Sequence, residues 1–395
     1  MSNGITHPPS LAHIPPVEFA EKDPRVIEAQ VIGDYEDAFE SLTNIAKTLA
    51  PGDPVRLLLL TVCQLLTQLR VNIDFAAKEN LLPYSHEEYL DGVASLYGPR
   101  ADRLPAAPAV TVFMFTLTAP QLVTVIIPIG TQVTGATNLI FATTRIATIP
   151  AGQLIAVNVP AVCTTPGVAG NGYAPGQFTT LVGWTQPYGM NVTNTEVTAY
   201  GSDVEPDENY RYRTWLTPES FSTCGPRQAY EYWSLQAHPD IIQCVVHSAP
   251  EIAGEVHLYP LMRGGVIPGD LILALVLRNC DAEIRRPVSD YVTAYKAVEV
   301  TYNVTVEWYA RRDDEVVIGQ IGPKVNDAVT GWIAWQREYI GRDINPNELI
   351  RRVLEAGAKR VDNTSLQPLF RVALYNELAT QFGPIIINFM GFEEE

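Results

Sequence analysis

The stretch LPAAPAVTVFMFTLTAPQLVTVIIPIG, residues 104–130, indicates the fold class of this chain. Apolar and polar residues alternate in it over short runs, and proline, glycine and asparagine separate these runs from similar ones further along. A period of two residues bounded by turn formers is typical of strands with one buried face. We therefore predict a central antiparallel β domain over residues 104–200, similar to a β-sandwich. Its strands include three runs: Val110, Val112, Phe113 and Phe115; Val123, Val125 and Ile127; and Ile155, Val157 and Val159.

This β region is almost free of charge, although the whole chain is acidic. The chain has 27 Lys+Arg and 44 Asp+Glu, a net charge of −17, yet Arg145 is the only charged residue from Leu104 to Thr195. Residues 1–100 carry 7 basic and 14 acidic side chains, and residues 201–395 carry 18 and 28. Because exposed sheet edges are normally protected by lysine or other charges, we expect other domains or subunits to cover this region.

The composition also excludes several classes of protein. A chain of 395 residues with 47% hydrophobic and 18% charged residues is globular, and its length predicts two or three domains. No cluster of lysine and arginine offers a face for nucleic acid. The apolar run Leu57–Leu69 is interrupted by threonine and glutamine, Leu271–Leu277 is too short to span a membrane, and the N-terminus lacks a signal-peptide layout. We therefore expect no nucleic acid and no membrane among the partners.

Three helices are predicted before the β region, after an extended, proline-punctuated arm over residues 1–33. Asp34 is a candidate cap for the first helix, which Pro51-Gly52 would end. Asp53-Pro54 is a capping residue followed by proline at the first helical position, and the apolar period continues to about Leu81. Together with a third, shorter helix, these form a predicted helical bundle region over residues 34–103.

The helix that starts at Pro54 is apolar on two sides, which predicts that it is buried on two sides. Leu57 and Leu60 lie off the main apolar stripe. The helix is then either the central helix of its own domain or part of a bundle between subunits. The candidate bundle residues are Val55, Leu57, Leu58, Leu60, Val62, Leu65, Leu66 and Leu69.

Residues 201–395 show a mixed pattern that predicts two α+β domains, over 201–322 and 323–395. Strand-like runs at Ile241–His247, Glu255–Tyr259 and Ala297–Tyr309 alternate with helical ones, including Pro323–Ile340 and a helix capped by Asn345-Pro346. The tail alternates like two strands, at Phe370, Val372 and Leu374 and at Ile385, Ile387 and Phe389. The predicted fold class is thus multidomain α+β, with N-terminal helices, a central antiparallel β domain and C-terminal mixed α/β domains.

No arrangement of residues is typical of catalysis, a cofactor or a metal. The histidines never pair at i, i+4, and Cys244 and His247 would point to opposite faces of a strand. The acids of Glu205–Glu208 are interpreted as the start of a helix, where the dipole favours negative charge. The five widely spaced cysteines predict buried thiols in a reducing compartment. We expect no enzyme and no catalytic, cofactor-binding or metal site.

Several motifs, taken in order and at their spacing, resemble the baseplate J-like family, the wedge proteins of contractile-tailed bacteriophages and tailocins. The resemblance covers nearly the whole chain, and its most specific part is Glu205-Pro-Asp-Glu-Asn-Tyr-Arg-Tyr-Arg213, followed by Cys224-Gly-Pro-Arg-Gln-Ala-Tyr230. Further matching segments are Asp53-Pro-Val-Arg-Leu-Leu58, Arg70–Leu82, Leu90-Asp-Gly-Val-Ala94, Pro128-Ile-Gly-Thr131, Gly167–Gly172, Arg286-Pro-Val288 and Gly341-Arg-Asp-Ile344.

The resemblance implies a structural subunit of a contractile tail baseplate wedge. Such a protein forms an inner ring around the hub and transmits fibre binding to sheath contraction. The implied partners are a second copy of the chain, a smaller baseplate I-like wedge protein, tail hub and sheath-initiator proteins, neighbouring wedges and the tail fibre attachment. The implied location is the virion, at the tail baseplate, after assembly in the bacterial host cytoplasm.

Two other functions stay open at this point. Trp184, Tyr173 and Tyr188 lie among polar turns, as on a β-sandwich carbohydrate-binding tail fibre protein, although such aromatics also close the ends of sandwiches. An acid–base hydrolase is the other class, and no convergent pair of carboxylates supports it.

Overall fold

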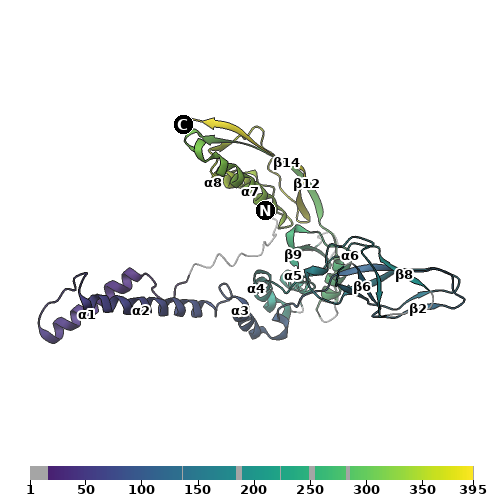
Figure 1. Cartoon of the computed structure of the whole chain (residues 1–395), viewed down its shortest axis with the longest axis horizontal. Helices are drawn as coiled ribbons and strands as arrows, with labels where there is room; N and C mark the ends of the chain where they lie inside the picture. The colour runs from purple at the N-terminus through teal and green to yellow at the C-terminus, as the bar shows by residue number, and fades with distance from the viewer. Residues whose placement is uncertain are drawn as a thin grey trace. The chain divides into compact units, whose positions relative to one another are not determined.

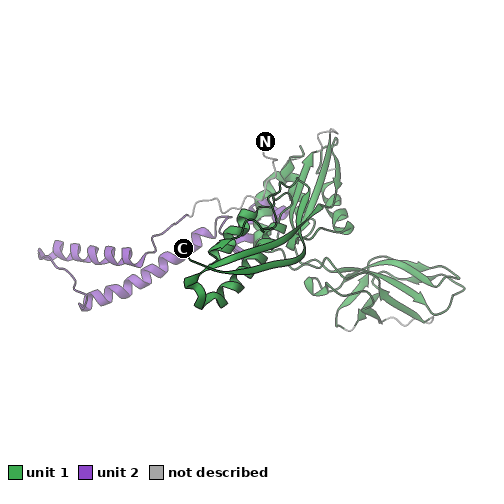
Figure 2. Cartoon of the chain, turned by 90° about the horizontal axis from the view of Figure 1, so that it is seen from above, with its two compact units in different colours: residues 1–7, 103–395 green, residues 8–102 purple. Residues whose placement is uncertain are grey.

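The computed structural model describes residues 17–135, 137–183, 189–222, 224–248, 254–281 and 285–394. The chain divides into two compact units, one over residues 8–102 and one built on residues 103–395 (Figure 2). The first unit is helical. It contains α1 (Pro24–Thr43), α2 (Pro54–Lys78), α3 (Glu87–Ala94) and a 3₁₀ segment (Ser95–Ala101) (Figure 1).

The first helix begins eleven residues earlier than the sequence predicts, with its cap at Asp23 and not at Asp34. Asp23 caps α1 by accepting a hydrogen bond from the Arg25 amide at 2.9 Å, and Pro24 takes the first helical position. The prediction of an extended arm to residue 33 with a cap at Asp34 is therefore wrong. Helix α1 also ends earlier than the predicted Pro51-Gly52, because Asn44, directly after Thr43, adopts a left-handed backbone conformation (φ 56°). The capped start of α2 at Asp53-Pro54 is confirmed, with Val55 N donating to Asp53 at 2.8 Å.

The region after residue 103 begins with the predicted antiparallel strands, which form a near-barrel. Six strands pair in the order β7-β3-β4-β6-β1-β8, and β2 and β5 form a separate two-stranded ribbon. Their bounds are β1 Val110–Leu117, β2 Val125–Ile127, β3 Gln132–Gly135, β4 Ile140–Thr143, β5 Ala147–Ile149, β6 Ile155–Cys163, β7 Phe178–Val182 and β8 Met190–Asn194.

The two edges of this sheet come together, so the region is one curled sheet where two packed sheets were expected. At the junction, Phe178 N of β7 donates to Asn194 Oδ1 of β8 at 3.1 Å, and Asn194 Nδ2 donates to Ala174 O at 3.0 Å. Because curling brings each edge against the other, this sheet does without the charged residues that normally protect edges.

A bulge changes the side-chain pattern of one predicted strand. Asn158 has a left-handed backbone (φ 57°), and the pairing of β1 with β6 shifts there from Phe113↔Val159 to Phe115↔Ala156. Ile155 and Val157 are consequently exposed while Val159 is buried, so the three do not share one face as strict alternation predicts. The core consists of Phe113, Phe115, Phe141 and Phe178 with smaller aliphatics.

The rest of the chain carries two mixed sheets covered by helices. The first has the order β11-β10-β9, with β9 and β10 antiparallel and β10 and β11 parallel. Its elements are α4 (Asp207–Leu216), α5 (Arg227–Leu235), β9 (Ile241–Ser248), β10 (Glu255–Met262), α6 (Asp270–Cys280) and β11 (Tyr291–Ala294).

The second mixed sheet has the order β13-β12-β14, and β12 and β14 run parallel. Its elements are β12 (Val298–Arg311), α7 (Ile318–Arg337), α8 (Pro346–Glu355), β13 (Arg360–Val361) and β14 (Glu377–Glu393). The predicted boundary between residues 322 and 323 is wrong, because it falls inside α7 and separates β12 from β14. Pro323 suggests a helix start but lies within the helix.

The predicted strand at Phe370, Val372 and Leu374 is absent from the described structure. These three residues are exposed, and the segment makes only one isolated bridge, between Arg371 and Ile344. The fold class itself is confirmed: helices at the N-terminus, a near-barrel antiparallel sheet in the centre, and mixed sheets with helices toward the C-terminus.

Candidate functional site

Helix α2 carries all eight predicted bundle residues, and one of its sides is covered by α1 and the loop that follows it. Arg56 Nη2 pairs with Glu28 Oε1 of α1 at 2.9 Å. Cys63 of α2 is buried, and burial raises the pKa of its thiol. Leu49, in the loop between the helices, is also buried, and its amide donates to Glu36 Oε1 at 2.7 Å. This side of α2 is therefore fixed inside the helical unit.

The same side of α2 is held near its C-terminal end by Asp74. Lys22 Nζ and Lys78 Nζ lie 2.7 and 2.8 Å from Asp74 Oδ2, and the Phe19 amide donates to Oδ1 at 2.8 Å. The hydrogen bonds from Lys22, then Lys78 and Phe19, hold the pKa of Asp74 well below its usual value. A negative charge at Asp74 thus fastens residues 19–22 to α2.

The other side of α2 is bare in the part of the chain that the structure describes. Leu57, Leu58, Val62, Leu65 and Leu69 are exposed by 40–65%, and Val55, Leu60 and Leu66 are half-buried. Leu58, Val62, Leu65 and Leu69 follow the four–three–four spacing of a coiled-coil seam. We call these four residues the α2 seam. Thus, of the eight predicted residues, four line one uncovered stripe.

The polar residues of α2 bear on what could cover this stripe. By length and composition alone, α2 is apolar enough to cross a membrane, although the sequence had suggested otherwise. However, a membrane-spanning α2 would take charged groups into the bilayer, at a high cost in free energy. These groups are the Arg56–Glu28 ion pair and the buried Asp74 with its two lysines. Uncharged Thr61, Gln64 and Gln68 flank the seam. These features favour a protein partner.

A second group of exposed aliphatic residues lies at the β2–β5 ribbon, and sequence reasoning did not single it out. It lies within the uncharged region, where coverage by other domains or subunits was expected. Its members are Leu122, Val123, Ile126, Ile129 and Ile146, and Leu122 is 98% exposed.

The most specific motif of the sequence forms a buried ion pair. Arg213 Nε and Nη2 lie 2.9 and 2.6 Å from the two oxygens of Glu205, and both side chains are almost fully buried. Leu104 N also donates to Glu205 Oε2 at 3.0 Å, and Arg103 Nη1 donates to Glu205 O at 2.9 Å. Asp207 and Glu208 lie in the first turn of α4, as predicted, whereas Glu205 lies before the helix and has a different role. Its carboxylate joins the chain entering the near-barrel to the far end of α4.

A second buried carboxylate is hydrogen-bonded to Tyr212 of α4. Glu231 on α5 is 3% exposed, and Tyr212 Oη donates to its Oε1 at 2.7 Å. Burial raises the pKa of Glu231 to about 7, against the opposing hydrogen bond from Tyr212 and the positive charge of Arg227. Glu231 is therefore partly protonated near neutral pH.

Glu231→Gln should stabilise the protein at pH 8. Since the pKa of Glu231 in the folded chain exceeds its unfolded value, its favourable contribution is present below the unfolded value of 4.5 and disappears as pH rises toward 7. The neutral amide of the variant should therefore raise the free energy of unfolding by on the order of 3 kcal/mol at pH 8 and by much less at pH 5. Urea unfolding at both pH values measures this. Equal gains at both, or the same gain from the exposed control Glu315→Gln, would contradict it.

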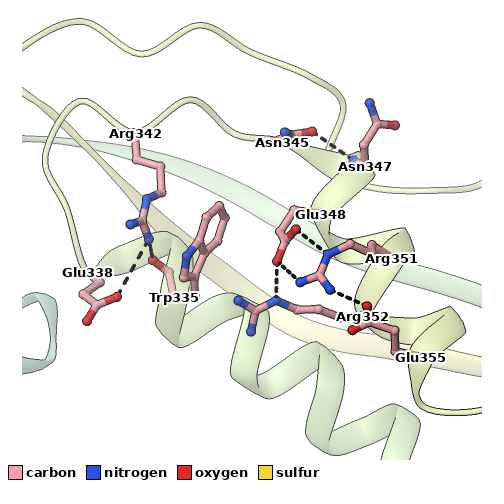
Figure 3. A network of polar contacts seen from close by, with 9 residues as sticks. All are labelled: Trp335, Glu338, Arg342, Asn345, Asn347, Glu348, Arg351, Arg352 and Glu355. Atoms are coloured by element: carbon pink, nitrogen blue, oxygen red, sulfur yellow. Dashed lines mark hydrogen bonds and ion pairs between the residues drawn. The ribbon is translucent and has the colours of Figure 1, made fainter. Parts of the chain in front are cut away.

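A charge network on α7 and α8 has a structural role (Figure 3). Asn345 caps α8 by accepting from the Asn347 amide at 3.0 Å, as predicted. Glu348 binds Arg351 Nη2 and Arg352 Nε at 2.7 and 2.8 Å, and the hydrogen bond from Arg351 is the main reason that its pKa falls to about 2. Arg352 and Arg342 stack on Trp335 of α7, so the network joins α8 to α7.

The histidines and cysteines form no reactive centre among the described residues. His247 and His257 are cross-strand neighbours, and His247 stacks on Tyr375 at 3.7 Å. Cys244 packs in the core on the other face of β9, as predicted. Four cysteines are buried, but Cys224 is exposed, which corrects the prediction for that residue. Within the described ranges, no group of three or more His, Cys, Asp or Glu could hold a metal ion.

Comparison with known proteins gives matches to two separate segments of the chain. The baseplate J-like protein barrel domain matches residues 112–201, which contain the near-barrel from within β1 onward. The baseplate J-like central domain matches residues 222–296. Baseplate protein J of Escherichia phage P2 is 26% identical over an alignment of 186 residues, and this alignment covers 44% of this chain. The chain spans about 60% of the length of that relative.

Among solved structures, the chain is similar to one in the cryo-EM structure of the anti-feeding prophage (AFP) baseplate, 6-fold symmetrised. The alignment covers 89% of this chain and 90% of that chain, with 10% sequence identity and a TM-score of 0.40.

Proposed function

This chain belongs to the baseplate J-like family, and on that premise we propose that it is a structural subunit of a contractile tail baseplate. Its place would be the tail end of a phage or phage-like particle, with assembly in the cytoplasm of the bacterial host. The matches to the barrel and central domains of the family support the proposal. The phage P2 relative, which carries the name baseplate protein J, supports it as well.

The observation that carries the proposal is the half-covered helix α2. Its inner side is fixed by Arg56–Glu28 and Asp74, whereas the α2 seam is left open with coiled-coil spacing. Each seam residue is a large aliphatic side chain, and burying one of them is worth about 1.5–3 kcal/mol. We infer that helices of other subunits cover it: one from a second copy and one from a smaller, baseplate I-like wedge protein.

The wider assignment follows from membership of the family. In it the chain contributes to an inner ring around the tail hub and contacts sheath-initiator proteins, neighbouring wedges and the tail fibre attachment. Ring rearrangement would then transmit fibre binding to sheath contraction. In this role the chain acts through binding and rearrangement and is not an enzyme.

Co-production with the other baseplate proteins of the same particle tests the proposal. Native mass spectrometry should detect a complex that contains two copies of this chain and one copy of the smaller wedge protein. A chain that stays alone in the presence of every other baseplate protein would contradict the proposed function.

No observation favours the carbohydrate-binding alternative. Trp184 and Tyr188 lie outside the described residues. The third aromatic, Tyr173, packs edge-to-face on Phe178 at 5.3 Å and is partly buried in the near-barrel core.

A further inference from the structure

The two mixed sheets of the chain meet in a buried contact. We call β11-β10-β9 the middle sheet, β13-β12-β14 the last sheet, and the contact between them the sheet junction. The Ile340 amide, which follows α7, donates across the junction to Gln243 Oε1 of β9 at 2.8 Å, and Arg337 Nε donates to Gly265 O at 3.0 Å. The apolar part of the junction is one cluster of buried residues: Val245, Tyr259, Leu261, Ala297, Ile340 and Leu378.

Two histidines lie on the face of the middle sheet that forms this junction. His247 of β9 and His257 of β10 are directly opposite each other in the antiparallel register. Residues in such a pair have Cβ atoms about 5 Å apart, so like charges there repel each other. The His247 ring stacks on the Tyr375 ring, with 3.7 Å between the centroids and 11° between the planes. Because Tyr375 comes just before β14 and packs on the buried cluster, His247 is part of the junction.

The surroundings of the pair favour neutral rings. Burial lowers the pKa of His247, and the positive charges of His257 and Arg227 lower it further. His257 Nε2 is buried and makes no hydrogen bond within the described residues, although Glu255 Oε1 lies 3.3 Å away. The charged groups that act on His247 are thus both positive, and the nearby carboxylate of Glu255 is beside the other ring.

The remaining groups around the pair do not oppose this picture. The rings that pack on it and on each other are those of three tyrosines: Tyr259 of β10, Tyr295 after β11 and Tyr375 before β14. Tyrosine and arginine keep their charge state between about pH 5.5 and 7.5. Glu231 of α5 does titrate in this range, with a pKa of about 7, but its protonation favours the folded chain. An acid-induced opening would therefore have to come from the histidines.

We propose that His247 and His257 form a proton-sensitive switch: when both rings are protonated, the sheet junction loosens and releases the last sheet from the middle sheet. Since the pKa of His247 is lower in the closed junction than in an open one, the closed junction binds fewer protons. The contribution of His247 to closure is complete above its ordinary value of 6.5 and is lost progressively as pH falls below it. The switch does not depend on the proposed function.

Hydrogen exchange of the Ile340 amide reports on the junction directly, because this amide donates to Gln243 across it. The full chain carries Glu231→Gln, so that the titration of Glu231 does not oppose that of His247. After correction for the pH dependence of chemical exchange, the protection of this amide should fall by about tenfold from pH 7.5 to pH 5.5. Protection of the Phe178 amide in the near-barrel, which donates to Asn194, should stay constant.

Histidine variants separate the switch from a general effect of acid. His247→Phe keeps a flat ring against Tyr375 but takes up no proton, so the protection of Ile340 should be equal at both pH values. His257→Phe removes the opposing charge and should make the fall smaller. His86→Phe is the matched control, at a histidine of the helical unit whose side chain is 63% exposed, and it should keep the full tenfold fall.

His247→Gln covers the case in which phenylalanine does not fit, because glutamine also takes up no proton and should give the same pH independence. Equal protection of Ile340 at both pH values in the starting protein would overturn the proposal. A tenfold fall that persists in both variants of His247, or an equal loss of protection in the near-barrel, would overturn it as well.

Discussion

Replacing Arg213 with methionine should lower the free energy of unfolding by about 3–5 kcal/mol, the largest effect expected of any single substitution discussed for this chain. Arg213 is fully buried, and its guanidinium binds both oxygens of Glu205. The methionine fills a similar volume but leaves the carboxylate of Glu205 buried without its main counter-charge. Urea unfolding, followed by tryptophan fluorescence, measures the loss.

The pair also predicts a rescue. Adding Glu205→Gln to Arg213→Met removes the uncompensated charge, so the double variant should regain a substantial part of the loss. The control is Arg351→Met, which makes the same change in an exposed ion pair with Glu348 and should cost no more than about 1 kcal/mol. Equal losses at positions 213 and 351, or no rescue in the double variant, would contradict a structural role for the buried pair.

Leu65→Lys with Leu69→Lys should abolish assembly with the other baseplate proteins while the isolated chain stays folded. Both residues are more than half exposed in the single chain, so the free energy of unfolding should change by only about 0.5 kcal/mol. In a helical bundle the same positions are desolvated, and two lysines there should weaken the complex by at least about a hundredfold.

Leu96→Lys is the matched control for this prediction, because Leu96 is 82% exposed in the same helical unit and lies outside α2. Its complex should form with normal yield. Recovery of the same amount of complex from the seam variant, measured by native mass spectrometry after co-production, would show that the α2 seam is not the interface.

Local sequence rules predicted the elements that local chemistry determines. Asp53-Pro54 starts α2 and Asn345 caps α8 because a capping side chain and a following proline act within one turn. Asp23-Pro24 has the same chemistry and starts α1. The sequence analysis did not predict this start, because the prolines before residue 33 were interpreted as marking an extended arm.

Features that depend on distant contacts could not be predicted in this way. The closure of the near-barrel depends on Asn194 meeting the start of β7, sixteen residues away in sequence at Phe178. Burial of Arg213 also runs against the usual exposure of arginine. A clue was present, however, because Glu205 lies just before α4 and Arg213, with the opposite charge, lies about two turns further along.

For the candidate site, the sequence predicted the helix and its two apolar sides but not which side the chain itself covers. The ion pairs Arg56–Glu28 and Lys22–Asp74 determine which side of α2 is covered, because both lie on the same side of the helix. The seam of Leu58, Val62, Leu65 and Leu69 is left on the other.

A cryo-EM map of the assembled particle tests the central claim most directly. The account predicts density for this chain in the tail baseplate, with Leu58, Val62, Leu65 and Leu69 buried against helices of other subunits. A map in which the chain lies elsewhere in the particle, or in which these four side chains face solvent within the baseplate, would contradict it.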